Sequence, residues 1–135
     1  MEAREHNATL WGLWLDAPDE RAQTMLDEGM ARRESYDFLG SIAVLSRLVD
    51  YCPDYAEGYN QRAFSYFVAR RYEEARADLE RALELNNRHI GALSGMALAL
   101  IELDRPAEAI PWLRRAVELH PFLAERALLD RLPGA

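Results

Sequence analysis

A repeat of 34 residues constrains the fold of this chain more than any other feature of its sequence. When the sequence is shifted against itself by 34 positions, residues 56–87 align with residues 90–121 without a gap. The segment RALEL then aligns with RAVEL, and the small residues Ala63 and Ala97 coincide. Periods of about 20 to 50 residues are typical of arrays in which each repeat is one supersecondary unit that packs on its neighbours. The chain is therefore expected to fold as such an array.

Helical hairpins are the unit that the apolar spacing predicts. Residues 22–55 form a third, weaker copy before the copies at 56–89 and 90–121. Within each copy the apolar residues are three and four positions apart, as in amphipathic helices, and one break divides each copy in two. We expect helices at 20–34, 38–50, 56–69, 72–85, 90–102 and 106–119, and a last helix at 122–132 that caps the C-terminal end.

The residues at fixed positions of the period resemble those of the tetratricopeptide repeat. The match is strong in the second and third copies and marginal in the first, and each copy closes with Pro or Asn. The matching residues are Tyr59, Ala63, Tyr66, Tyr72, Ala75, Leu79 and Ala82, with Pro53, Asn87 and Pro121. The resemblance implies one all-α domain over residues 1–135, a right-handed α-solenoid of about three helical hairpins. Small residues would let paired helices approach closely, and Leu45, Leu79 and Leu113 would fill the space between layers.

The first copy departs from the family pattern at two positions and the second copy at one. The pattern has leucine at the positions of Glu28 and Arg62, and an aromatic residue at the position of Arg32. We therefore expect the first helix of the first copy to bury less surface than the equivalent helices of the other copies.

The segment LWGLWL near the N-terminus has the spacing of a second helix that has lost its partner. Counted by the period, Trp11 takes the position of Leu45, and Trp14 that of Leu48. We expect an N-terminal capping helix at 6–18 that covers the first repeat. Two alternatives stay open: a helix that fills the groove of another molecule, and a contact with a membrane surface, although no Lys or Arg flanks the segment closely.

The sequence carries no pattern of catalytic or metal-binding residues, and we expect no enzymatic activity and no cofactor. The three histidines, His6, His89 and His120, stand far apart, and the motifs HExxH, CxxC and GxGxxG are absent. The ordinary role for His89 and His120, which fall in turns between repeats, is a helix cap or a solvent contact. Acidic pairs such as Glu73 with Glu74 alternate with arginines, which is typical of a solvated helix face.

The charge and hydropathy of the chain exclude some partners and locations. The net charge is −7, which disfavours nucleic acid because phosphate binding depends on neutralisation by Lys and Arg. The longest apolar run, MALALI, is far shorter than the roughly 18 residues that span a bilayer. The single cysteine, Cys52, has no internal disulfide partner. We expect a bacterial protein of the cytoplasm, or of the periplasm if a leader peptide has been removed.

The resemblance also implies where a partner binds, because the family uses the concave wall formed by the first helix of every repeat as a receptor for peptides or helices. On this wall Met30, Phe64 and Leu98 are equivalent by the period and form an apolar stripe. Gly91 and Gly95 leave a shallow floor beside it. The predicted partner-binding residues are Met30, Arg33, Glu57, Asn60, Gln61, Phe64, Phe67, Ser94, Leu98 and Ile101.

The charges on this wall define the partner further. Members of the family that bind chaperones hold a C-terminal carboxylate with lysine, arginine and asparagine, and here only Asn60 matches that set. Four acids and one arginine, Asp27, Glu34, Glu57, Glu102 and Arg33, give the wall a formal charge of −3. We therefore expect a protein or peptide segment that is apolar with some basic character. The chain would be a non-enzymatic adaptor; the alternative is a structural subunit whose groove mediates self-association as a homodimer.

Overall fold

The computed structural model describes residues 17–134, and the predicted N-terminal helix at 6–18, with both of its tryptophans, lies almost entirely outside this range. The described residues form six α-helices and a C-terminal 3₁₀ helix, with no strand among them: α3 Glu20–Glu34, α4 Phe38–Tyr51, α5 Ala56–Val68, α6 Tyr72–Leu85, α7 Ile90–Glu102, α8 Pro106–Leu119 and η1 Ala124–Asp130. The helix limits that the apolar spacing predicts for α3 to α8 are confirmed to within one residue.

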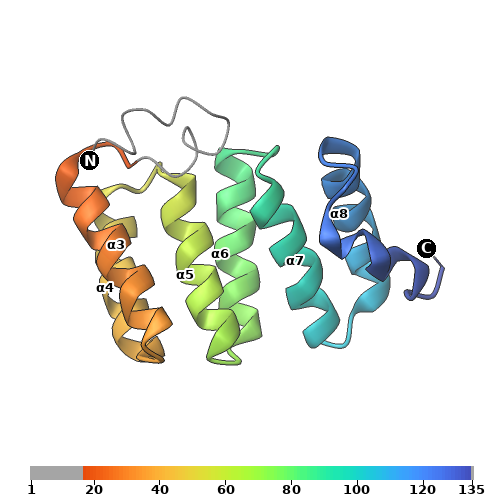
Figure 1. The fold of residues 1–135 in the computed structure, drawn as a ribbon, viewed down its shortest axis with the longest axis horizontal. Coiled ribbons are helices and arrows are strands. Elements are labelled where there is room, and N and C mark those ends of the chain that lie inside the picture. The colour runs from red at the N-terminus through yellow and green to blue at the C-terminus, as the bar shows by residue number, and fades with distance from the viewer. Residues whose placement is uncertain (1–16, 135) are drawn as a thin grey trace.

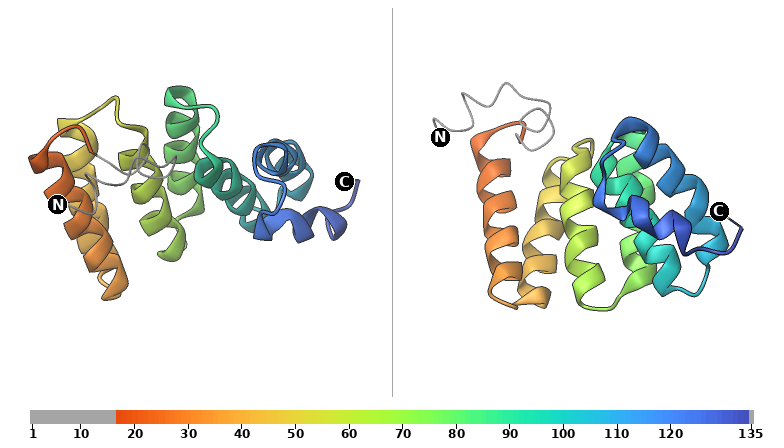
Figure 2. Two further views of the ribbon diagram at one scale, coloured as in Figure 1. Left: turned by 45° about the horizontal axis from the view of Figure 1, so that its top comes forward. Right: turned by 45° about the vertical axis from the view of Figure 1, so that its right-hand side comes forward.

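The helices pair in chain order as three hairpins that stack side by side. The pairs α3–α4, α5–α6 and α7–α8 make the most extensive contacts, and α4 with α5 and α6 with α7 join consecutive hairpins. Figure 1 shows the hairpins in one row with α3 and α8 at its opposite ends, and the two views of Figure 2 agree. The predicted all-α solenoid is therefore confirmed.

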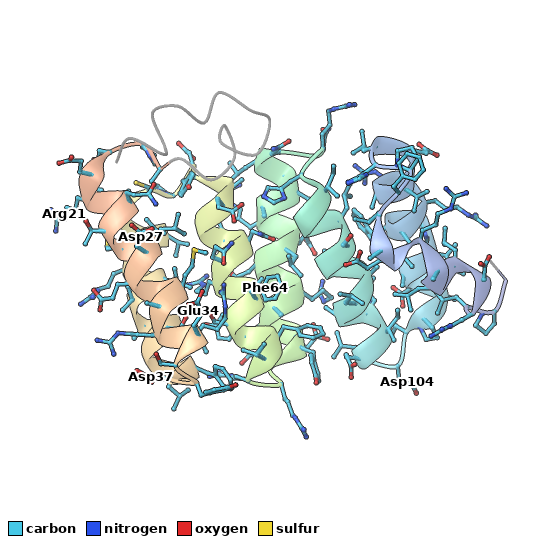
Figure 3. The ribbon with its side chains drawn as sticks, in the orientation of Figure 1. Arg21, Asp27, Glu34, Asp37, Phe64 and Asp104 are labelled. Carbon is cyan, nitrogen blue, oxygen red and sulfur yellow. The ribbon has the colours of Figure 1, made fainter. Side chains whose placement is uncertain are left out.

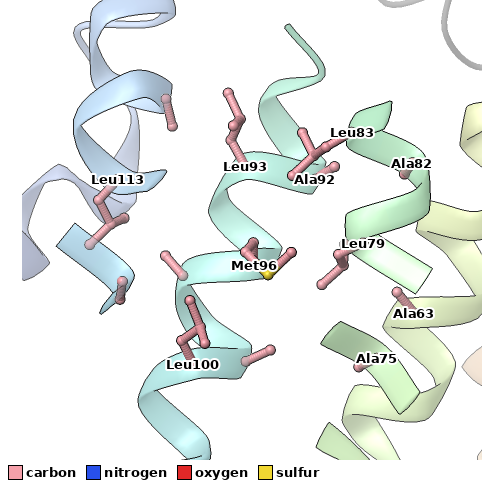
Figure 4. Packing of buried hydrophobic residues seen from close by; sticks show 14 residues of the cluster. Ala63, Ala75, Leu79, Ala82, Leu83, Ala92, Leu93, Met96, Leu100 and Leu113 are labelled. Atoms are coloured by element: carbon pink, nitrogen blue, oxygen red, sulfur yellow. The ribbon is translucent and has the colours of Figure 1, made fainter. Parts of the chain in front are cut away.

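The core lies between the paired helices, where the repeat places small residues and leucines. Ala63, Ala75, Ala97 and Ala109 are each at most 1% exposed. Figure 4 shows the alanines of α5 and α6 beside Leu79, with Leu113 on the far side of α7. Because alanine lets two helix backbones approach closely, larger leucines can bridge consecutive layers without leaving cavities. The predicted roles of these positions are confirmed.

The first helix of the first hairpin buries less than its equivalents, as predicted. Three residues of α3 are buried, compared with six of α5 and eight of α7. Arg32 stands where the family pattern has an aromatic residue, and it is exposed and bonded to Glu28 and Asp37. A charged side chain at this position faces solvent, whereas the equivalent Leu100 of α7 is buried, which accounts for part of the difference.

The turn inside each hairpin contains a residue with a left-handed backbone. Tyr36, Arg70 and Asp104 have φ values of 64°, 63° and 61°, and they are 34 positions apart. None of the three is glycine, although residues other than Gly, Asn and Asp are strained in the left-handed region of the backbone. The repeat therefore conserves the geometry of the turn rather than its residue type.

The C-terminal segment differs from the α-helix predicted at 122–132. Residues Ala124–Asp130 form a 3₁₀ helix that contacts α8 and has no fully buried residue. The segment lies between Pro121 and Pro133, so it is short, and short segments at helix ends often adopt this tighter turn. Its leucines still pack against the core of the last repeat, as a cap should: Leu123, Leu128, Leu129 and Leu132.

Candidate functional site

The first helices of the three hairpins form one wall of the solenoid. Helix α5 contacts both α3 and α7, which places the three side by side. Figure 3 shows the molecule from the side on which Asp27 and Glu34 of α3 and Phe64 of α5 lie. Equivalent residues of the three helices therefore follow one another across a single surface, which we call the groove.

A pocket of about 210 Å³ lies in the groove between α5, α7 and the C-terminal segment. Its surface is mostly apolar, and among residues 17–134 the only charged one that lines it is Glu125. The lining residues are Asn60, Ala63, Phe64, Phe67, Leu79, Ile90, Gly91, Ser94, Gly95, Leu98, Leu123 and Glu125. Apolar concave sites with a few polar groups are the usual form of a binding site.

Five of the ten predicted site residues meet at this pocket: Asn60, Phe64, Phe67, Ser94 and Leu98. The ring of Phe64 is 55% exposed, an unusual position for a large apolar side chain. Phe67 packs edge to face on Tyr72, with ring centroids 5.2 Å apart. The two glycines of the predicted floor, Gly91 and Gly95, also line the pocket.

Two further predicted residues of the wall are apolar. Met30 is partly buried and packs on the apolar cluster of the first hairpin. Ile101 is partly buried and packs on the cluster that contains α7 and α8. Neither residue lines the pocket, and each also contributes to the core.

The polar residues Arg33, Glu57 and Gln61 are engaged with one another below the wall surface. The guanidinium of Arg33 donates to the carbonyl oxygen of Gln61 at 3.1 Å and to its side-chain oxygen at 2.7 Å. The amide nitrogen of Gln61 donates to the Glu57 carboxylate. Burial lowers the pKa of Arg33. These groups form a network that links α3 to α5, so the wall presents fewer polar groups to a partner than the sequence predicts.

His89 joins this network to α7 and begins that helix. The backbone N–H of Ala92 donates to Nδ1 of His89 at 3.1 Å, which confirms the predicted helix cap. This hydrogen bond assigns the ring proton to Nε2, which donates to Oε1 of Glu57 at 2.7 Å. Glu57 is 2% exposed and His89 4%. A neutral imidazole and a buried carboxylate therefore connect the second and third hairpins.

The sequence does not indicate that the C-terminal segment contributes to the pocket. Leu123 and Glu125 form part of its lining, although they lie more than 20 residues after α7 in the chain. The leucine spacing of the segment predicts that it covers a neighbour. Which face it covers depends on the turn at Pro121, which no local pattern specifies.

The exposed charges around the groove are predominantly negative. Glu34, Glu102 and Asp27 are exposed, and Glu125 lines the pocket. The cation nearest to Phe64 is Arg33, whose guanidinium lies 5.1 Å from the ring centroid. Because Arg33 is held by Gln61, most of its hydrogen-bonding capacity is used inside the protein. The exposed part of the groove is therefore negative beside its apolar surface.

Two other kinds of site are absent from residues 17–134. No group of three or more His, Cys, Asp or Glu side chains there is arranged to hold a metal ion. No helix in this part of the chain has the length and apolar character needed to cross a membrane.

Comparison with known sequences identifies the family. The sequence model of the family "Tetratricopeptide repeat" matches residues 54–121, which is half of the chain. This chain belongs to the tetratricopeptide repeat family. A TPR repeat-containing protein of Rhizobium etli is 38% identical over 69 residues, 51% of this chain and 34% of the relative. A tetratricopeptide repeat protein 36 homolog of Nematostella vectensis is 32% identical over 78 residues, 58% of this chain and 42% of that protein. This tetratricopeptide repeat chain thus spans less than half the length of either relative, and the bacterial one fits the expected origin.

Solved tetratricopeptide repeat structures share the fold at low sequence identity. The first TPR of Spaghetti (RPAP3) bound to HSP90 peptide SRMEEVD superposes with a TM-score of 0.80 at 23% identity, covering 84% of this chain and 91% of that chain. The second TPR domain of human RPAP3, in complex with HSP70 peptide SGPTIEEVD, gives 0.79 at 22% identity, with coverage of 85% and 97%. Tetratricopeptide repeat domains such as these are non-enzymatic modules of protein–protein interaction.

Proposed function

We propose that this tetratricopeptide repeat chain is an adaptor that binds an apolar segment of a partner protein in its groove. The observation that carries the proposal is the apolar pocket between α5 and α7, with the exposed ring of Phe64 at its edge. An exposed phenylalanine beside a concave apolar surface gains hydrophobic stabilisation when a partner covers it. The family and its structural neighbours, which act as interaction modules, support this function.

The partner segment in this proposal carries basic residues beside its apolar contact. The peptides bound by the two neighbours named above end in the acidic sequence EEVD. The pocket of this chain contains no Arg, Lys or His among its lining residues, and Glu125 would repel an acidic peptide. We therefore expect a ligand chemistry different from that of these neighbours.

Substitution of the apolar stripe tests the adaptor function. The double variant Phe64→Gln and Leu98→Gln should lose capture of partner proteins from a lysate, while helical circular dichroism is unchanged. Leu39→Gln is the matched control, because Leu39 is 70% exposed on α4 and does not line the pocket. Equal capture by the double variant and the wild type would contradict the proposal. Loss of helical signal would show that the two side chains support the fold instead.

Self-association through the groove is the alternative outcome. Light scattering over a dilution series measures it, because a homodimer dissociates as the concentration falls. A dimer that the Phe64→Gln and Leu98→Gln variant disrupts would replace the adaptor function with a structural one. A monomer at all concentrations would leave the groove open to other proteins.

A further inference from the structure

The pocket contains a buried hydroxyl group without a hydrogen bond. Ser94 is 6% exposed and lines the pocket, and its Oγ atom has no hydrogen-bond partner among the described residues. Buried polar groups in folded proteins are nearly always bonded, because an unpaired one loses its interaction with water without compensation. An unpaired hydroxyl at a concave surface therefore indicates a group that a ligand completes.

Other buried serines of this fold are fully bonded, so the exception belongs to the pocket. Ser41 and Ser65 are both 0% exposed. The Ser41 hydroxyl donates to the carbonyl oxygen of Gly29 at 2.7 Å, and the two serine oxygens lie 2.6 Å apart. The same residue type is thus satisfied between the first and second hairpins and left unsatisfied between the second and third.

The size of the pocket fits one large apolar side chain. Its volume is about 210 Å³, and an apolar protein cavity of about 150 Å³ is enough to hold benzene. Phe64, Leu98 and Leu123 supply apolar contacts around it. A phenylalanine, leucine or methionine side chain of the partner is therefore the natural occupant.

Two glycines lie beside Ser94 on the side of α7 that faces the pocket. Gly91 is exposed and Gly95 is partly buried, and both line the pocket on the same helix as Ser94. A Cβ atom on Gly91 would meet His89, and one on Gly95 would meet Leu79, so Gly95 lets α7 pack closely on the second hairpin. The Ser94 Oγ atom is almost fully buried, and it meets a partner carbonyl when the side chain turns about χ1 toward the pocket.

A free carboxylate does not suit this position. Within the described part of the chain, Glu125 is the only charged residue that lines the pocket, and no lining residue is a cation. A carboxylate bound here would lose its hydration and face a like charge. The inserted side chain must then come from an internal residue of the partner rather than from its C-terminal residue.

We propose that the pocket holds one bulky apolar side chain from an internal position of the partner, and that the Ser94 hydroxyl donates to the partner backbone beside it. This inference rests on the proposed adaptor function and names the contact that would give it specificity. Ser94 is thus a binding residue whose hydrogen bond forms only in the complex.

Three small probes test the pocket on the full chain by NMR. N-acetyl-phenylalanine N-methylamide should shift the backbone amide signals of Gly91, Ser94 and Gly95 saturably. N-acetyl-phenylalanine, which has a free carboxylate, should bind with an affinity at least about tenfold lower. The reason is that one uncompensated charge outweighs one neutral hydrogen bond. N-acetyl-alanine N-methylamide should produce no saturable shift. Equal binding of the acid and the amide, or of the alanine and phenylalanine probes, would overturn the inference, as would the absence of any shift with the first probe.

Ser94→Ala separates a binding role from a structural one. The variant should melt at a higher temperature than the wild type, because it removes an unpaired hydroxyl, and should bind the phenylalanine amide about 3- to 10-fold more weakly. Ser65→Ala is the control, and it should melt at a lower temperature and bind the probe as the wild type does. A Ser94→Ala protein that melts lower, or that binds the probe with wild-type affinity, refutes the assignment of the hydroxyl.

The two proposals fail in different ways. If the probes bind but the Phe64→Gln and Leu98→Gln variant captures the same proteins as the wild type, the pocket stands and the adaptor function falls. If that variant loses its partners but the probes leave Ser94 undisturbed, the adaptor function stands and the pocket contact falls.

Discussion

The second and third hairpins follow one repeat pattern but differ in the chemistry of their interiors. Four of the six buried residues of α5 are polar, whereas Ser94 is the only polar one of the eight in α7. Arg62 and Asp78 of the second hairpin are equivalent to Met96 and Trp112 of the third, which belong to the apolar core. One backbone arrangement therefore accepts an ion pair or an apolar pair at the same place.

The ion pair is tolerated because its geometry is complete. Arg62 Nε and Nη2 donate to the two carboxylate oxygens of Asp78, each at 2.7 Å. Burial raises the pKa of Asp78, and the hydrogen bonds from Arg62 oppose that rise. The hydrogen bond with Asp78 raises the pKa of Arg62. Bidentate pairing thus compensates both groups for their partly buried position. The repeat therefore sets where the core side chains lie, and these side chains can be polar or apolar provided that every polar group has a hydrogen-bond partner.

Truncation of the layer leucines should give the largest effect. Leu113→Ala in the third hairpin should lower the free energy of unfolding by about 2 to 5 kcal/mol, measured by urea denaturation. Leu79→Ala, its equivalent in the second hairpin, should cost less, because Leu79 borders the groove pocket and the space it leaves can open toward solvent. A larger loss for Leu79→Ala would show that the enclosed core is not the main source of stability.

Breaking the ion pair should give an intermediate effect. Arg62→Met introduces the residue of the third hairpin and leaves Asp78 without its partner. It should lower the free energy of unfolding by about 1 to 3 kcal/mol. This is less than the loss for a fully buried pair, because Arg62 is partly exposed. Adding Asp78→Leu should restore stability to within about 1 kcal/mol of the wild type. No recovery in the double variant would mean that the hairpins are not interchangeable here.

The cost of Arg62→Met should depend on pH. Without its partner, the buried Asp78 has a pKa raised further above its ordinary value, so the folded state takes up a proton more readily than the unfolded state. Stability relative to the wild type then rises as the pH falls through that raised pKa, and the full loss is present above it. Thermal melts between neutral and mildly acidic pH measure this, and a cost independent of pH would exclude Asp78 as the cause.

The hairpin turns should give the smallest effect. Arg70→Gly in the second hairpin should raise the free energy of unfolding by about 0.5 kcal/mol, since relief of the left-handed strain exceeds the added freedom of the unfolded chain. Asp104→Gly in the third should have almost no effect, because aspartate tolerates this conformation better. Figure 3 shows Asp104 at the end of its hairpin. Denaturant midpoints of the two variants give the comparison, and equal shifts would contradict it.

The sequence predicts the elements of this fold well because their signals are local. The three-and-four spacing of apolar residues and the breaks between them set the helix limits, and the 34-residue period aligns the small residues that face each other in the core. The C-terminal segment is predicted less well, since a short stretch between two prolines carries too little periodicity to distinguish an α-helix from a 3₁₀ helix.

The contacts of the candidate site are predicted only in part. The period identifies Phe64 and Leu98 as equivalent residues of one wall. It does not indicate that Glu57 is bonded to His89, or Arg33 to Gln61, because these partners are 32 and 28 residues apart and belong to different hairpins. The predicted partner-binding side chains of Arg33, Glu57 and Gln61 therefore form hydrogen bonds inside the protein instead.

The sequence by itself determined the helices, their pairing into hairpins and the positions of the small and large core residues, because each follows from spacing along one helix or from the repeat. Only the tertiary structure decided which polar residues pair between hairpins, how the C-terminal segment closes the pocket and that the Ser94 hydroxyl is left without a bond. These features depend on the distance between side chains on separate elements, and packing of the whole array sets that distance.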